Sequence, residues 1–175
     1  TVAAFAGNFK TAHRKGVDFL SGYCAVKPAP SDIVITTNGG YPLDQNAYQC
    51  PKGMSAAEAT VNDGGVIIML ATCQDGHGGE SYYHSIADAE SADAFFQQCL
   101  HTPQVETLPD QWCAQIWCRI VRKYKVLFVA DKAQEQLIRD LKVEYFETLD
   151  EAYARARELK GPDATLACIP NGVSV

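Results

Sequence analysis

Short apolar runs alternate with longer amphipathic stretches along most of the chain. The apolar runs are rich in β-branched and aromatic residues and predict strands at 33–37, 66–72, 125–130, 143–146 and 165–169. The stretches between them repeat apolar residues at helical spacing and predict helices at 43–49, 55–61, 81–86, 91–100, 112–124, 134–141 and 148–161. This alternation predicts an α/β fold, a Rossmann-like three-layer sandwich with a mostly parallel sheet and helices on both faces.

Local signals set the expected ends of these elements. The patterns Ser55–Glu58 and Thr148–Glu151 are capping boxes that predict helix starts. Pro51 is expected to break or kink the helix before it and to push Cys50 out of the α region. The run Asn62–Gly65 predicts a turn ahead of the strand at 66–72.

The first thirty residues differ from the rest. Residues 8–21 have helical spacing with Asn8 as the expected N-cap, and Pro28 and Pro30 predict an extended linker. The sequence starts at Thr1, in the middle of an apolar run and without a methionine. We therefore expect residues 1–30 to form an interdomain helix and linker, and residues 31–175 to form one α/β domain of a longer protein.

Composition narrows the class of protein. The 175 residues carry a formal charge of −6, with no basic stripe, which argues against nucleic acid as a partner. No apolar run approaches the length of a membrane span, and the amino end lacks the features of a signal peptide. Seven scattered cysteines, an odd number, favour a reducing, cytoplasmic location over a disulfide framework.

Two glycine-rich loops follow successive predicted strands. The first contains Asn38, Gly39 and Gly40, and the second contains Asp75, His77, Gly78 and Gly79. In a parallel sheet both loops lie at the carboxyl edge, where ligands bind, and glycine allows a ligand to approach the backbone closely. The alternative is that both loops are simple turns.

Tyr48, Gln49 and Lys52 lie within about one helical turn, next to the first glycine loop. An ammonium group and an amide donor suit a substrate carboxylate, so we expect a small-molecule site that holds an anion. The alternative is an exposed lysine, a surface amide and a tyrosine packed on the sheet.

Other chemistry-bearing residues give weaker signals. His77 and His84 do not have the spacing of a metal pair, and no Cys-x-x-Cys motif accompanies them, so we predict no metal site. The cysteines are interpreted as packing residues. Of Trp112 and Trp117, one can lie in the core while the other faces a ligand or a partner domain.

One long motif resembles the carboxyl-terminal domain of the nickel-pincer lactate racemase family: Asn38-Gly-Gly-Tyr-Pro-Leu-Asp-Gln-Asn46, then Tyr48-Gln49, Lys52-Gly53 and Ala56-Ala-Glu58. Further segments resemble it in the same order along the chain: Ala12-His-Arg-Lys-Gly16, Gly64-Gly-Val-Ile-Ile68, Asp75-Gly-His-Gly-Gly-Glu80, and Trp112 with Gln115. The resemblance covers nearly the whole chain. Pro51 departs from the aliphatic residue expected in relatives and could rotate Lys52 away from the cleft.

The resemblance implies an isomerase, a racemase or epimerase of 2-hydroxy acids that abstracts and returns a hydride on a nickel-pincer nucleotide. The nickel ligand, the cofactor-anchoring lysine and the catalytic histidines belong to the family's amino-terminal domain, so no catalytic residue and no cofactor is expected in this fragment alone. What carries over is the substrate side: Tyr48, Gln49, Lys52 and Trp112, with Gln49 and Lys52 near the carboxylate.

We therefore expect residues 31–175 to be the carboxyl-terminal domain of such a racemase, partnered by the amino-terminal domain of the same chain and by a small 2-hydroxy acid. The isolated fragment should be inactive. Two alternatives remain. One is an unrelated α/β enzyme in which Asp75, His77 and Lys52 converge; the other is a ligand-binding or docking module without catalysis.

Overall fold

The centre of the molecule is a five-stranded, all-parallel sheet with strand order β4-β3-β2-β1-β5. The structure is a computed structural model that describes residues 1–175. The strands are β1 (Ser31–Thr37), β2 (Val61–Leu70), β3 (Lys125–Val129), β4 (Glu144–Phe146) and β5 (Leu166–Ile169). All five strands predicted from the sequence are present, and the expected α/β fold is confirmed.

One helix precedes the first strand, and the other six lie between consecutive strands. They are α1 (Phe9–Cys24), α2 (Pro51–Glu58), α3 (Glu80–Ala87), α4 (Ala92–His101), α5 (Gln111–Val121), α6 (Glu135–Asp140) and α7 (Leu149–Lys160). Three single turns of 3₁₀ helix are η1 (Ala47–Gln49), η2 (Gln104–Glu106) and η3 (Lys132–Gln134). The predicted capping box of Thr148 and Glu151 is present at the start of α7, with both reciprocal hydrogen bonds formed.

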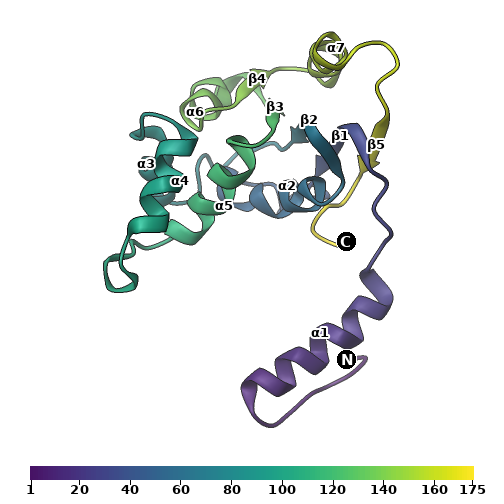
Figure 1. Cartoon of the computed structure of the whole chain (residues 1–175), viewed down its shortest axis with the longest axis vertical. Helices are drawn as coiled ribbons and strands as arrows, with labels where there is room; N and C mark the ends of the chain where they lie inside the picture. Colours follow the sequence, from purple (N-terminus) through teal and green to yellow (C-terminus); the bar gives the residue numbers. More distant parts are fainter.

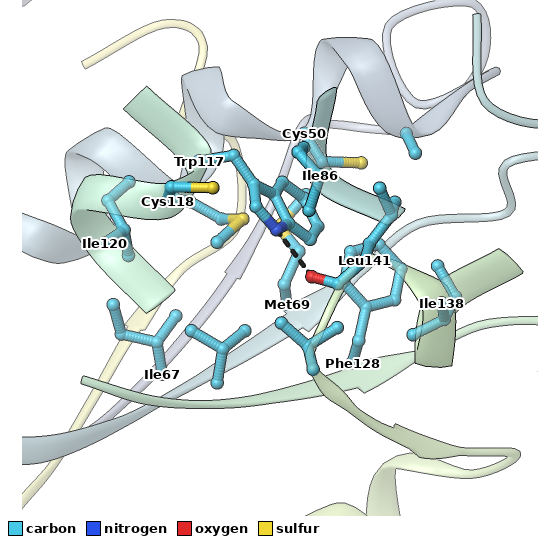
Figure 2. Close-up of a cluster of buried hydrophobic side chains, with 14 of the residues drawn as sticks. Cys50, Ile67, Met69, Ile86, Trp117, Cys118, Ile120, Phe128, Ile138 and Leu141 are labelled. Carbon is cyan, nitrogen blue, oxygen red and sulfur yellow. Dashed lines mark hydrogen bonds between the residues drawn. The ribbon is translucent and has the colours of Figure 1, made fainter. Parts of the chain in front are cut away.

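The sheet divides the core into two unequal layers. Alternate strand residues point to opposite faces, so Val34 and Ile67 join a cluster of 27 buried residues under α2 to α6. Ile33 and Ile68 point the other way, into a cluster of seven buried residues covered by α7. Figure 2 shows the larger cluster, where the buried indole of Trp117 donates a hydrogen bond from Nε1 to the Leu141 carbonyl at 2.9 Å.

Three predictions for the segment around Pro51 were wrong. Residues 43–46 form turns, and only Ala47–Gln49 is helical, as a 3₁₀ turn. Pro51 begins α2 at its first position, where a missing N–H is tolerated, and Cys50 keeps αR geometry. Ser55 therefore lies inside α2, where its hydroxyl donates to the Pro51 carbonyl at 2.7 Å.

The predicted turn at Asn62–Gly65 belongs instead to β2, which begins at Val61. The register between β1 and β2 shifts between Ser31 and Ile33, so a bulge absorbs the extra residues. The glycines there mark this irregularity and not the end of the strand.

Helix α1 stands apart from the rest of the chain, as Figure 1 shows. Asn8 caps it as predicted, since its side chain accepts hydrogen bonds from the Lys10 and Thr11 N–H groups. None of its residues is buried. The residues ahead of α1 contribute one aromatic contact, with ring centroids of Phe5 and Phe19 5.7 Å apart.

Candidate functional site

Asn38, at the end of β1, is the anchor of the segment that carries Tyr48, Gln49 and Lys52. Its side chain is completely buried. Nδ2 donates to the carbonyls of Leu43 and Gln49, both at 2.8 Å, and Oδ1 accepts from the Gly53 N–H at 3.0 Å. Asn38 thus does not face a cleft in this chain. It fixes the backbone on both sides of the predicted substrate residues.

The two glycines after Asn38 turn the chain with φ of +85° and +89°. A Cβ at Gly39 would lie 2.9 Å from the side chain of Asn171, so the first glycine loop packs tightly on the turn that follows β5. The Thr37 hydroxyl joins the same two elements, because it donates to the Pro170 carbonyl at 2.7 Å and accepts from the Gly39 N–H at 2.8 Å. This close packing explains why position 39 is a glycine.

Gln49 and Lys52 lie together although a proline separates them. Gln49 ends η1 and Lys52 occupies the first turn of α2, and the Lys52 ammonium donates to Gln49 Oε1 at 2.6 Å. Lys52 is exposed and Gln49 is partly buried. Pro51 therefore leaves Lys52 beside Gln49, so the pair presents a cation and an amide at one exposed point.

The second glycine loop, residues 73–79, binds the same segment through its backbone. The Gly76 and His77 carbonyls accept from the Ala47 and Tyr48 N–H groups, both at 3.0 Å, and the Asp75 N–H donates to the Gln45 carbonyl at 2.8 Å. The second glycine loop is thus bonded directly to the segment that follows the first glycine loop. The Asp75 side chain itself is exposed.

His77 closes its own loop. Its Nδ1 accepts from the Gly79 N–H at 3.1 Å, so in the neutral ring the proton lies on Nε2, which is 3.5 Å from Glu80 Oε1. The ring stacks on Tyr83 with centroids 5.1 Å apart. Gly78 has φ of +81°, and a Cβ there would collide with the Asn46 side chain. Both residues have clear roles in holding the loop.

The two tryptophans take different roles, as the sequence allowed. Trp117 is fully buried, whereas Trp112 is 58% exposed at the start of α5. The Trp112 ring contacts Tyr48 edge-on, with centroids 6.1 Å apart and planes at 83°. Tyr48 in turn contacts the buried Tyr82 at 5.5 Å. Tyr48 and Trp112 therefore form one aromatic surface next to Gln49.

Asp110 is a site residue that sequence reasoning missed. Its Oδ1 accepts the Tyr48 hydroxyl at 3.2 Å. The available signal was an aspartate just ahead of the helix that carries Trp112, a position that ordinarily suggests only an N-cap. Burial, and then the bond to Asp110, raises the pKa of the Tyr48 phenol, so Tyr48 stays neutral at physiological pH.

The nearby cysteines are packing groups. Burial raises the pKa of the Cys113 thiol to about 12, and it raises that of Cys50 well above its usual range. The Cys113 thiol donates to the Tyr48 carbonyl at 3.4 Å, and the Cys50 and Cys73 sulfurs are 4.0 Å apart. Protonated, buried thiols are poor nucleophiles, so these residues support the segment without reacting.

Two hollows lie beside these residues. One, of about 620 Å³, runs between the linker at 25–29, α2 and β5, and Lys52 lines it. The other, of about 330 Å³, lies beyond the carboxyl ends of β1, β2 and β3 and includes Gly40 and Asp44. No three histidine, cysteine, aspartate or glutamate side chains are arranged to hold a metal ion. None of the helices combines the length and hydrophobicity of a membrane span.

Comparison with known proteins gives consistent matches. The sequence model of the lactate racemase carboxyl-terminal domain matches residues 26–175. Over 174 residues the chain is 47% identical to the lactate racemase of Lactiplantibacillus plantarum and 45% identical to that of Thermoanaerobacterium thermosaccharolyticum. Each alignment covers 99% of this chain but 41% of the relative, so the chain spans about two fifths of the length of these relatives.

The fold is also found in a solved structure. The lactate racemase apoprotein from Thermoanaerobacterium thermosaccharolyticum superposes with a TM-score of 0.92 at 45% identity, over 99% of this chain and 42% of that chain. Because the match covers 99% of the chain, it includes nearly all of residues 1–30 as well as the α/β domain.

Proposed function

Because this chain belongs to the lactate racemase family, in the region of its carboxyl-terminal domain, we propose that it supplies the carboxylate-binding wall of a 2-hydroxy acid racemase or epimerase. The observation that carries the proposal is the Lys52–Gln49 pair, with 2.6 Å between Nζ and Oε1. That bond uses one of three ammonium donors, which leaves two for a carboxylate, and the Gln49 amide nitrogen is a further donor. Burying a carboxylate requires such a cation and such donors.

The geometry suits racemisation. A racemase must hold the α-carbon so that a hydride can leave and return on either face, and a fixed carboxylate restricts the substrate to that motion. Asn38 holds the backbone at Gln49 and Gly53, and the second glycine loop holds the backbone just ahead of Gln49, so the carboxylate site is largely formed before substrate binds. The aromatic surface of Tyr48 and Trp112 then offers an apolar wall for a small substituent.

The family resemblance implies a nickel-pincer nucleotide, which would accept and return the hydride when bound. The side chains of this chain offer no metal-ligand set, so we assign that group to the part of the protein outside residues 1–175. In this proposal the isolated chain is inactive. Lys52 and Gln49 orient the substrate, and closure of the two parts of the protein excludes water from it.

We also propose that residues 1–30 form the interdomain helix and linker. In support, α1 buries none of its residues yet exposes Phe9, Val17, Leu20 and Tyr23. A helix whose apolar side chains are left uncovered fits a position against a further domain. Residues 31–175 are then the carboxyl-terminal α/β domain.

The test is Lys52→Ala in the full-length protein, with Lys132→Ala as the matched control, since Lys132 is an exposed lysine on η3. We expect Lys52→Ala to raise the KM for lactate at least tenfold while the thermal midpoint is unchanged, and Lys132→Ala to alter neither. Wild-type turnover in Lys52→Ala would remove Lys52 from the site. Racemisation by the isolated chain without nickel cofactor would favour the unrelated-enzyme alternative, with Asp75, His77 and Lys52.

A further inference from the structure

Asp110 departs from the usual role of an aspartate at the start of a helix. It occupies the N-cap position of α5, but its side chain makes no capping hydrogen bond. Aspartate at an N-cap ordinarily accepts from the N–H groups of the first turn. Its backbone also adopts the left-handed conformation, with φ of +61° and ψ of 2°, which most residues with a Cβ avoid and which aspartate and asparagine tolerate. A local rule broken in this way is often found at a functional site.

The diverted carboxylate goes to Tyr48. Oδ1 accepts the phenol proton at 3.2 Å, and a Cβ at Gly79 would lie 3.6 Å from Oδ2. Asp110 therefore lies where the amino end of α5, Tyr48 and the second glycine loop meet. The residues that it joins are 62 positions apart in sequence, so neither helix capping nor local turn formation accounts for the contact.

Every other part of Tyr48 is already fixed. Its N–H donates to the His77 carbonyl at 3.0 Å, and its carbonyl accepts from the Cys113 thiol at 3.4 Å. Its ring packs edge-on against Tyr82 and Trp112. The bond to Asp110 sets the remaining freedom, the direction of the hydroxyl proton. With that proton committed, the phenol oxygen can only accept a hydrogen bond from a ligand.

We propose that Asp110 is a positioning residue for the 2-hydroxy acid site: it holds the Tyr48 phenol as a neutral acceptor and keeps its ring against Trp112. This inference rests on the proposed function. It makes the Tyr48 oxygen unsuitable for a carboxylate, which needs donors, and suitable for a hydroxyl, which can donate. The carboxylate then falls to Gln49 and Lys52, and Tyr48 faces the hydroxyl and substituent end of the substrate.

The experiment is a double-mutant cycle in the full-length protein with lactate as substrate. Asp110→Gly removes the carboxylate but suits the left-handed backbone, and Asp110→Asn keeps an acceptor in a residue that also tolerates it. We expect Asp110→Gly to raise KM roughly tenfold with kcat within about twofold, because a charge-assisted hydrogen bond is lost from a binding wall. Asp110→Asn should stay within about threefold of wild type.

The coupling to Tyr48 is the decisive result. In a Tyr48→Phe background, Asp110→Gly should have no further effect on KM. Asp140→Ala is the matched control: it removes another tyrosine–aspartate bond, from Tyr83 at 2.7 Å, and should leave KM unchanged.

An undiminished effect of Asp110→Gly in the Tyr48→Phe background, or equal damage by Asp110→Asn, would overturn the inference. If neither Asp110→Gly nor Lys52→Ala raises KM, the proposed function fails together with the role of Asp110. If Lys52→Ala raises KM while Asp110→Gly does not, only the role of Asp110 fails.

Discussion

Replacing Asn38 with alanine should destabilise the domain more than its single side chain suggests. The change leaves two carbonyls and one N–H without their partner, in a place where Asn38 is completely buried. Each unsatisfied buried group costs about 1–3 kcal/mol, and water can reach the two partly buried carbonyls, so we expect about 3 kcal/mol in total. For a chain of this size that corresponds to a fall in Tm of about 6–12 °C.

The assay is thermal unfolding of this chain followed by circular dichroism. Asn62→Ala is the control, because it removes a single side-chain hydrogen bond at the opposite end of the sheet. In that bond Asn62 Nδ2 donates to Asp32 Oδ1 at 3.0 Å. That variant should lose about 1 kcal/mol or less. A fall in Tm for Asn38→Ala of less than 3 °C, or no larger than that of Asn62→Ala, would refute the role of Asn38 as the anchor of this segment.

Three other substitutions test further contacts in the domain. Gly53→Ala places a Cβ 2.5 Å from Asn38 Oδ1 and 3.1 Å from the Thr37 carbonyl oxygen. It should lower the free energy of unfolding by about 2 kcal/mol, seen as a lower urea midpoint. Gly22→Ala, with no atom within 4 Å, should not lower it. Hydrogen bonds from Asn62 and Thr165 lower the Asp32 pKa from 3.8 to about 2, so its stabilisation is present above pH 3.8 and is lost as pH falls through about 2. The urea midpoint of Asp32→Asn should therefore lie below that of wild type at pH 6 and converge with it between pH 4 and pH 2; a constant gap would contradict this. Trp117→Phe loses the Leu141 bond and buried volume and should cost roughly 2 kcal/mol in chemical unfolding, whereas Trp112→Phe should cost less than about 0.5 kcal/mol.

The sheet was predictable because its strands are continuous apolar runs. Such a run is recognised from neighbouring residues alone and does not depend on distant contacts. The starts of the helices near the candidate site were harder to predict. Pro51 can end one helix or begin another, and its neighbours Cys50 and Ser55 fit either outcome. Asn38 favours a helix that begins at Pro51, because its Oδ1 accepts from the Gly53 N–H in the first turn of α2. This hydrogen bond joins positions 15 apart. Such tertiary hydrogen bonds are invisible to a local pattern.

The candidate site, too, was predictable only in part. The motif placed Tyr48, Gln49 and Lys52 close together, and the structure has Gln49 and Lys52 in direct contact. It did not separate residues that support the segment, such as Asn38 and His77, from those that remain exposed, such as Lys52. Asp110 was missed because its partner lies 62 residues away and its position has an ordinary local explanation.

The place of β1 between β2 and β5 has a consequence for synthesis on the ribosome. Asp32, in β1, and Thr165, beside β5, are joined across 133 residues. At about 5–20 residues per second, β1 waits about 7–27 s for its second neighbour. Throughout that interval one edge of the strand is unpaired, and an unpaired edge is a template for association with other chains. The nascent sheet therefore keeps an open edge in its middle until β5 has been synthesised.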